Sequence, residues 1–276
     1  MNPSRLSTAR APHRSRVLGM ALLVPNRSGV ALAPYVSSTA PGKFRSANPT
    51  PFNRYVLFIK PFSLTRIDQF RAPPPPALDS AAYATAFNES KASGGTFSAV
   101  RSAEQLEIVR FHTEVPALFV TRNLGRFAAS TSDVTEAARL MALVYVVHAD
   151  AIGACFEAKY FYEFWRPLSA IALADDDGNP ATTSDAAWTP VAPTPNHPEY
   201  PAEHSCTFGA LGETLRLHYG THQVIYMFDS AMTGTTRTYA TTDALNDETN
   251  LARVRGGMHF AFSTAVEVEL GRRAAQ

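Results

Sequence analysis

Cysteine is scarce in this chain of 276 residues, which contains only Cys155 and Cys206. Two cysteines allow at most one disulfide, and neither has the neighbouring ligands that a zinc site needs. The sequence therefore excludes a disulfide framework and predicts two buried thiols. Cysteine usage leaves the cellular compartment undecided.

Long apolar runs and an excess of one charge are also lacking. The chain carries 25 basic and 24 acidic residues, a net charge of +1, so nothing favours nucleic acid or an anionic membrane surface as a partner. The most apolar stretch, residues 140–147, is far shorter than the ~18 residues of a membrane span. We expect no transmembrane segment, and an anion could be bound only where positive charges cluster locally.

Residues 1–45 are rich in Ser, Pro, Arg and Ala and show no sustained period, which predicts an irregular N-terminal tail. Basic residues precede an apolar run from Val17 to Val24, as they do in a secretory signal. The run is short, so a tail is the preferred interpretation, and secretion or a periplasmic location is the weaker one.

Helix signals dominate residues 46–276, which are predicted to form one all-α domain of packed helices. Ser80 can cap a helix over 81–91, and Ser102 with Gln105 forms a capping box for the next helix. A Pro-rich loop is expected over 175–201. Further helices are predicted over 203–219, 243–255 and 260–272.

Two further elements are considered, a long helix after residue 133 and a short strand near residue 55. Asp133 begins a long apolar helix that we expect to be buried and to reach about Trp165. The segment from Tyr55 to Ile59 could form a short strand, but a strand this isolated has little to pair with.

Positive charges recur near the end of the long helix. Lys159 and Arg166 are seven residues apart, two helical turns, so we expect both on one face. Two inward-facing cations repel each other unless an anion lies between them. The pair predicts an anion site, although such a pair taken alone is more typical of a solvated surface.

Two later segments can contribute to the same site. Pro201-Ala202-Glu203-His204 begins a helix, where free N–H groups attract anions and His204 can transfer a proton. Downstream, Arg253 adds a cation, and two glycines allow a turn that aims His259 inward. Each segment alone is unremarkable as a helix start or turn, whereas their ordered combination favours a functional site.

This ordered set resembles the pattern Lys-x6-Arg-Pro, Pro-Ser-Gly-His and Ser-Arg-x5-His of the vanadium-dependent haloperoxidase and type-2 phosphatidic acid phosphatase superfamily. The flanking text resembles the bacterial and plant-type haloperoxidase-related branch, as in Phe-Trp-Arg-Pro (164–167), His-Pro-Glu-Tyr-Pro (197–201) and Gly-Gly-Met-His-Phe (256–260). The resemblance implies a helical bundle of that type. It also implies that part of the N-terminal helices is missing, so that apolar faces of the long helix are exposed and a homo-oligomer is possible.

The resemblance implies a role for each matching residue. Lys159, Arg166 and Arg253, with the backbone N–H of Glu203, would bind the oxygens of vanadate, or of phosphate in the same site. His259 would bond to vanadium, or attack phosphorus as a nucleophile. In the reaction itself, His204 would act as acid or base, and Lys159 would also polarise bound hydrogen peroxide.

Three functions are compatible with that site. The first is a haloperoxidase that oxidises a halide with hydrogen peroxide at vanadate bound by His259. The second is an acid phosphatase that hydrolyses a phosphate ester through a phosphohistidine, without a metal. The third is an inactive remnant that binds an oxyanion without turnover.

Four positions depart from the family pattern. Ala202 and Ala252 stand where relatives have Ser, so hydroxyl groups near the anion are missing. Glu203 replaces a Gly, and its carboxylate must either swing away from the anion or repel it. Ser263 stands where the peroxidases carry an Asp that would hold the second ring nitrogen of His259.

Two further polar residues have alternative interpretations. His197 resembles the His that bromide-oxidising relatives carry seven residues before the acid–base His, but a loop His that caps local carbonyls fits equally well. Asp150 lies in an apolar stretch, where we expect it to pair with His148 or with another helix.

Overall fold

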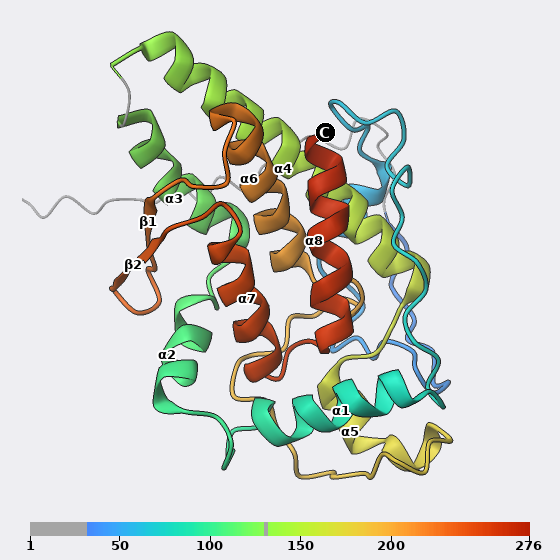
Figure 1. Cartoon of the computed structure of the whole chain (residues 1–276). Helices are drawn as coiled ribbons and strands as arrows, with labels where there is room; N and C mark the ends of the chain where they lie inside the picture. The colour runs from blue at the N-terminus through green and yellow to red at the C-terminus, as the bar shows by residue number, and fades with distance from the viewer. Residues whose placement is uncertain (1–31, 130–131) are drawn as a thin grey trace, which may run out of the picture. The chain divides into compact units, whose positions relative to one another are not determined.

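Helices make up most of the computed structural model, which describes residues 32–129 and 132–276 (Figure 1). The signal-like segment and most of the predicted tail lie outside the described residues. The elements are η1 (Arg54–Phe58), α1 (Ala81–Gly94), α2 (Ala103–Phe111), α3 (Pro116–Ala129), α4 (Val134–Tyr162), α5 (Pro167–Ala172), η2 (Ala174–Asp176), α6 (Glu203–Tyr219), β1 (Tyr226–Asp229), β2 (Thr236–Tyr239), α7 (Ala244–Arg255) and α8 (Ala261–Ala275). The predicted all-α class is confirmed, with one small antiparallel pair, β1 and β2, added to it.

Helices α4, α6 and α8 pack against one another and form the centre of the bundle (Figure 1). The approach of α6 to α8 is close because glycines face the partner helix. A Cβ added at Gly271 would lie 2.2 Å from the backbone oxygen of Cys206, and one added at Gly209 would lie 2.9 Å from that of Val268. Both cysteines are buried free thiols, as predicted.

The cap signals of the sequence are confirmed. Asp133 accepts from the backbone N–H groups of Thr135 and Glu136 at the start of α4. Ser80 caps α1, which continues three residues beyond the predicted end to Gly94. The capping box at the start of α2 is complete on both sides.

Helix α4 ends at Tyr162, earlier than predicted. Glu163 adopts a left-handed conformation with φ 52°, and its N–H bonds to the carbonyl of Lys159. Pro167 does not interrupt this helix; it is the first residue of α5, where a proline needs no N–H partner.

Helix α4 is also long and apolar enough to cross a membrane by length and composition. Its most apolar window is 56% buried inside the structure, however, and it carries the buried charged side chains of Asp150 and Lys159. Its contacts with α6 and α8 are those of a core helix.

Two expectations from the sequence are wrong, and two features of the fold were not predicted. Residues Arg54–Phe58 form a 3-10 helix rather than a strand. Among the described residues no strand lies beside them with which they could pair. Asp150 accepts from the backbone N–H groups of Phe62, Ser63 and Leu64 instead of pairing with His148. The hairpin of β1 and β2 and the helix α3 were not predicted.

The end of the predicted tail contacts the end of α4. The Tyr35 hydroxyl donates to Glu163, and the backbone N–H of Phe44 donates to the Glu163 carbonyl at 2.7 Å. The backbone N–H of Trp165 donates to the Gly42 carbonyl at 2.9 Å. A domain boundary near residue 45 stays a prediction, and these contacts hold the chain around residue 165 in place.

Candidate functional site

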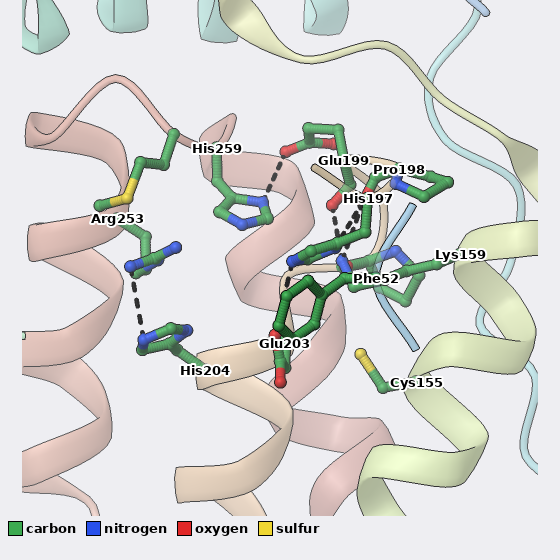
Figure 2. Close-up of polar contacts among 12 residues, drawn as sticks. Phe52, Cys155, Lys159, His197, Pro198, Glu199, Glu203, His204, Arg253 and His259 are labelled. Atoms are coloured by element: carbon green, nitrogen blue, oxygen red, sulfur yellow. Dashed lines mark hydrogen bonds and ion pairs between the residues drawn. The ribbon is translucent and has the colours of Figure 1, made fainter. Parts of the chain in front are cut away.

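The segment 197–204, which leads into α6, is surrounded by buried charged and histidine side chains. They come from α4, from the N-cap of α5, from α7 and from the turn before α8, and Figure 2 shows Lys159, Arg253 and His259 among them. Lys159, in the last turn of α4, reaches this segment from one side. Its ammonium group donates to the carbonyls of Glu199 at 3.0 Å and Pro198 at 3.2 Å, and also to that of Pro201. All three ammonium hydrogens are therefore used to hold the loop.

Arg166 reaches the same segment from the start of α5. Its Nε donates to the carbonyl of His197, and its Nη1 lies 2.9 Å both from the carbonyl of Met258 and from Nε2 of His259. The expectation that Lys159 and Arg166 share a helix face is wrong, because α4 ends between them. The two cations converge because both bind the loop before α6.

Arg253, in the last turn of α7, is 2% exposed and poorly paired. Its Nη1 makes two long contacts of 3.4 Å, to the carbonyl of His112 and to Nε2 of His204. Its Nε has no hydrogen-bond partner among the described residues. Burial and, second, the charge of Arg166 lower the pKa of Arg253 to about 9, so it remains cationic at neutral pH.

His259 contacts Arg166 through one ring nitrogen and Glu199 through the other. The turn before it brings Gly257, with φ +72°, against Gly94 of α1, where a Cβ on either residue would meet backbone at 2.5 Å. Nδ1 of His259 lies 3.0 Å from Oε1 of Glu199 (Figure 2). Burial, and then the charge of Arg166, hold the pKa of His259 well below its usual value, so the ring is neutral.

Glu199 is a member of the site that the sequence analysis missed. It is fully buried and accepts from the backbone N–H of Phe260 at 2.9 Å and the hydroxyl of Ser263 at 2.7 Å. Burial raises the pKa of Glu199 to about 7, against the opposing charge of Arg166. Its place in His-Pro-Glu-Tyr-Pro, 60 residues before His259, was the only signal in the sequence.

His204 occupies the first turn of α6, as predicted. Its Nε2 lies 3.0 Å from the carbonyl of Glu114, a group that can only accept, so Nε2 carries the hydrogen. Nδ1 is then a free lone pair, and it has no hydrogen-bond partner among the described residues. Burial, followed by the charge of Arg253, holds the pKa of His204 well below its usual value.

Glu203 begins α6, and its carboxylate does not swing out to solvent. Oε2 lies 3.5 Å from Nε2 of His197, and the group is largely buried. Burial raises the pKa of Glu203, while the charges of Lys159, Arg253 and Arg166 oppose this. The N-cap residue Ala202 supplies no side-chain oxygen, so the first-turn N–H groups of α6 lack a capping side chain.

His197 is a buried residue of the loop before α6. Its Nδ1 lies 3.2 Å from the carbonyl of Pro198 and 3.0 Å from Nη2 of Arg166. The contact with Pro198 matches the local-capping interpretation, and a role in halide preference stays a prediction.

The donors of this cluster suit an anion rather than a metal cation. Three cations, Lys159, Arg166 and Arg253, face two carboxylates, Glu199 and Glu203. Within residues 32–129 and 132–276, no group of three or more His, Cys, Asp and Glu side chains could hold a metal ion. The unpartnered Arg253 Nε and the uncapped start of α6 can donate to a tetrahedral oxyanion, and the lone pair of His204 Nδ1 can accept from a hydroxyl group of a protonated one.

Comparison with known proteins places this chain in a family. The family model of the VCPO second helical-bundle domain matches residues 139–276, half of the chain. Vanadium chloroperoxidase of Curvularia inaequalis is 31% identical over 179 residues, which cover 55% of this chain and 29% of that protein.

Two solved structures share the fold. A bacterial vanadium-dependent iodoperoxidase superposes with a TM-score of 0.70 at 25% identity, over 85% of this chain and 59% of that one. The apo form of a bacterial vanadium-dependent chloroperoxidase superposes with a TM-score of 0.64 at 13% identity, over 88% of this chain and 60% of that one. The chain thus spans well under two thirds of the length of these relatives.

Proposed function

Because the chain belongs to the family of the second helical-bundle domain of vanadium chloroperoxidase, we propose that it binds vanadate and oxidises a halide with hydrogen peroxide. The observation that carries the proposal is the buried guanidinium group of Arg253. Its Nε lacks a partner among the described residues, and the same cluster holds the cations Lys159 and Arg166. A buried cation without an adequate counter-ion is destabilising, so its presence favours an anionic ligand.

The residues that would hold vanadate surround that group. Arg253 would donate to its oxygens, and the N–H of Glu203 at the start of α6 would donate to another oxygen. Arg166 would donate to vanadate in place of its present contacts with the rings of His259 and His197. His259 would bond to vanadium through Nε2, which Arg166 now faces. Because the ammonium hydrogens of Lys159 already bind carbonyls, we assign it charge stabilisation rather than a direct hydrogen bond.

Bound vanadate would supply the Lewis-acidic centre at which hydrogen peroxide is activated for attack by a halide. His204 would take up a proton from the incoming peroxide, since its Nδ1 is a lone pair without a partner among the described residues. Burial keeps His204 neutral, so the lone pair of Nδ1 is available to the incoming peroxide.

The test is bromide oxidation by hydrogen peroxide with apo and vanadate-loaded protein. We expect vanadate-dependent turnover in the wild type and only background turnover in His259→Ala. The control is His218→Ala, in the last turn of α6 and outside the cluster, which should keep the wild-type turnover. Folded wild-type protein that binds vanadate but does not oxidise bromide or iodide would contradict the peroxidase proposal.

The same experiment separates the other two functions. The charges that suit vanadate also suit phosphate, so hydrolysis of a simple phosphate ester that depends on His259 would identify an acid phosphatase. Oxyanion binding with neither activity would identify a remnant that binds without turnover.

A further inference from the structure

We infer that Glu199 is the positioning residue that orients His259 for bonding to the oxyanion, in place of the Asp that is absent at position 263. The inference rests on the proposed function for the identity of the ligand. It concerns the geometry of His259, which exists before any ligand binds.

Three hydrogen bonds fix the Glu199 carboxylate against the start of α8, and Figure 2 shows the one to His259. Oε1 accepts from Nδ1 of His259 at 3.0 Å and from the backbone N–H of Phe260 at 2.9 Å. Oε2 accepts from the hydroxyl of Ser263 at 2.7 Å. Ser263 therefore does not hold the ring itself but helps to hold the carboxylate that does.

The two neighbours of the His259 ring select one tautomer. The guanidinium group of Arg166 can only donate, so Nε2, 2.9 Å from its Nη1, must present a lone pair. Nδ1 must then carry the hydrogen, and it faces the acceptor oxygen of Glu199. This tautomer leaves Nε2 as the atom that can bond to vanadium or phosphorus.

The backbone of Glu199 is held as firmly as its side chain. Its N–H donates to the carbonyl of Phe164 at 2.9 Å, and its own carbonyl accepts from Lys159 at 3.0 Å. Lys159 thereby acts on His259 through Glu199. Among the described residues the side-chain hydrogen bonds of Glu199 go to His259, Phe260 and Ser263 rather than to Arg166, so Glu199 orients the ring and is more than a counter-ion.

The test compares variants of Glu199 by two readouts. One is the ¹⁵N spectrum of the His259 ring in the apo protein, assigned by its loss in His259→Ala; the other is the dissociation constant for vanadate. In the wild type we expect a single tautomer with hydrogen on Nδ1. Glu199→Met removes the acceptor, so we expect mixed tautomers and vanadate affinity reduced about 10- to 100-fold.

Two further variants keep the test decisive should Glu199→Met fold poorly. Glu199→Gln keeps an acceptor oxygen of the same reach, so we expect the tautomer to persist. Vanadate affinity should fall because an amide makes His259 a weaker base than a carboxylate does. Adding Ser263→Asp to Glu199→Met supplies a carboxylate from α8 and should restore both readouts. The matched control is Glu213→Gln, a buried carboxylate of α6 that pairs with Arg216 instead of His259 and should change neither readout.

The outcomes separate the two claims. A wild-type His259 with hydrogen on Nε2, or Glu199→Met protein with unchanged tautomer and vanadate affinity, would overturn the positioning role. Folded wild-type protein that shows the expected tautomer but binds no oxyanion would overturn the proposed function and leave the orientation of His259 by Glu199 supported.

Discussion

Arg253 carries a buried positive charge that the surrounding groups compensate poorly. Its Nη1 lies 3.4 Å from the carbonyl of His112 and from Nε2 of His204, and its Nε has no partner in the part of the chain that the structure describes. An anion would satisfy these donors, so the apo protein should be less stable than one with an apolar side chain of similar length there.

Arg253→Met is therefore expected to stabilise the protein in buffer free of phosphate and vanadate, by about 1–3 kcal/mol. The same variant should lose the stabilisation that added vanadate gives the wild type. Chemical denaturation with and without the anion measures both effects.

Arg255→Met is the control, because Arg255 lies two residues away and pairs with Glu89 at a partly exposed site. It should change the free energy of unfolding by less than about 1 kcal/mol and keep the response to vanadate. An Arg253→Met protein less stable than the wild type without anion would contradict an uncompensated charge.

The sequence predicted the residue types of the site better than their arrangement. The ordered spacing of charged residues is visible in a single sequence, so the cluster of Lys159, Arg166, Arg253, His204 and His259 could be recognised from it. Glu199 escaped notice because a carboxylate beside a proline loop has no local pattern that marks it. Its partner His259 is brought to it only by the packing of α8.

Single glycines decide how closely the central helices approach. Gly271 of α8 faces the backbone of α6, where an added Cβ would lie 2.2 Å from the oxygen of Cys206. Because that neighbour is backbone, it can move only if the helices separate. Gly271→Ala is expected to destabilise the fold by about 1–3 kcal/mol, measured by thermal or chemical unfolding.

Gly125→Ala in α3 is the matched control. A Cβ added there meets nothing within 4 Å, so alanine should stabilise the helix by up to about 1 kcal/mol. Equal effects of the two substitutions would show that intrinsic helix preference, and not the α6–α8 approach, governs position 271.

Elements with strong local signals were predictable, and those that depend on partners were not. Caps and capping boxes act over three or four residues, which is why the starts of α1, α2 and α4 were found. The short strands β1 and β2 gain their stability from each other and from packing on α3. The end of α4 depends on Glu163, a non-glycine residue in a left-handed conformation that no sequence rule predicts.

At the scale of the whole molecule, an apolar stripe remains exposed on the first half of α4. Val134 is 80% exposed and Tyr145 is 41% exposed, and the alanines at 138, 142 and 149 continue the same face at spacings of three and four. A stripe of this kind favours association with another apolar surface.

We expect concentration-dependent self-association of the purified protein, reduced by Val134→Glu combined with Tyr145→Glu. Sedimentation velocity over a range of protein concentrations measures it. Val36→Glu is the control, since Val36 is 86% exposed but lies outside α4. A wild type that stays monomeric throughout the range would contradict this expectation.

The candidate site joins elements that are distant along the chain. Lys159 comes from α4, Arg166 from the start of α5, His204 from α6, and Arg253 from α7, with His259 directly before α8. An oxyanion held by these residues would cross-link the bundle, so binding and global stability should be coupled.

The most direct test of the central claim is a calorimetric titration of the folded protein with vanadate and with phosphate. We predict one oxyanion bound per chain, competition between the two anions, and loss of binding in Arg253→Met. Folded wild-type protein that binds neither anion, or an Arg253→Met variant that binds as tightly as the wild type, would contradict an oxyanion site at this cluster.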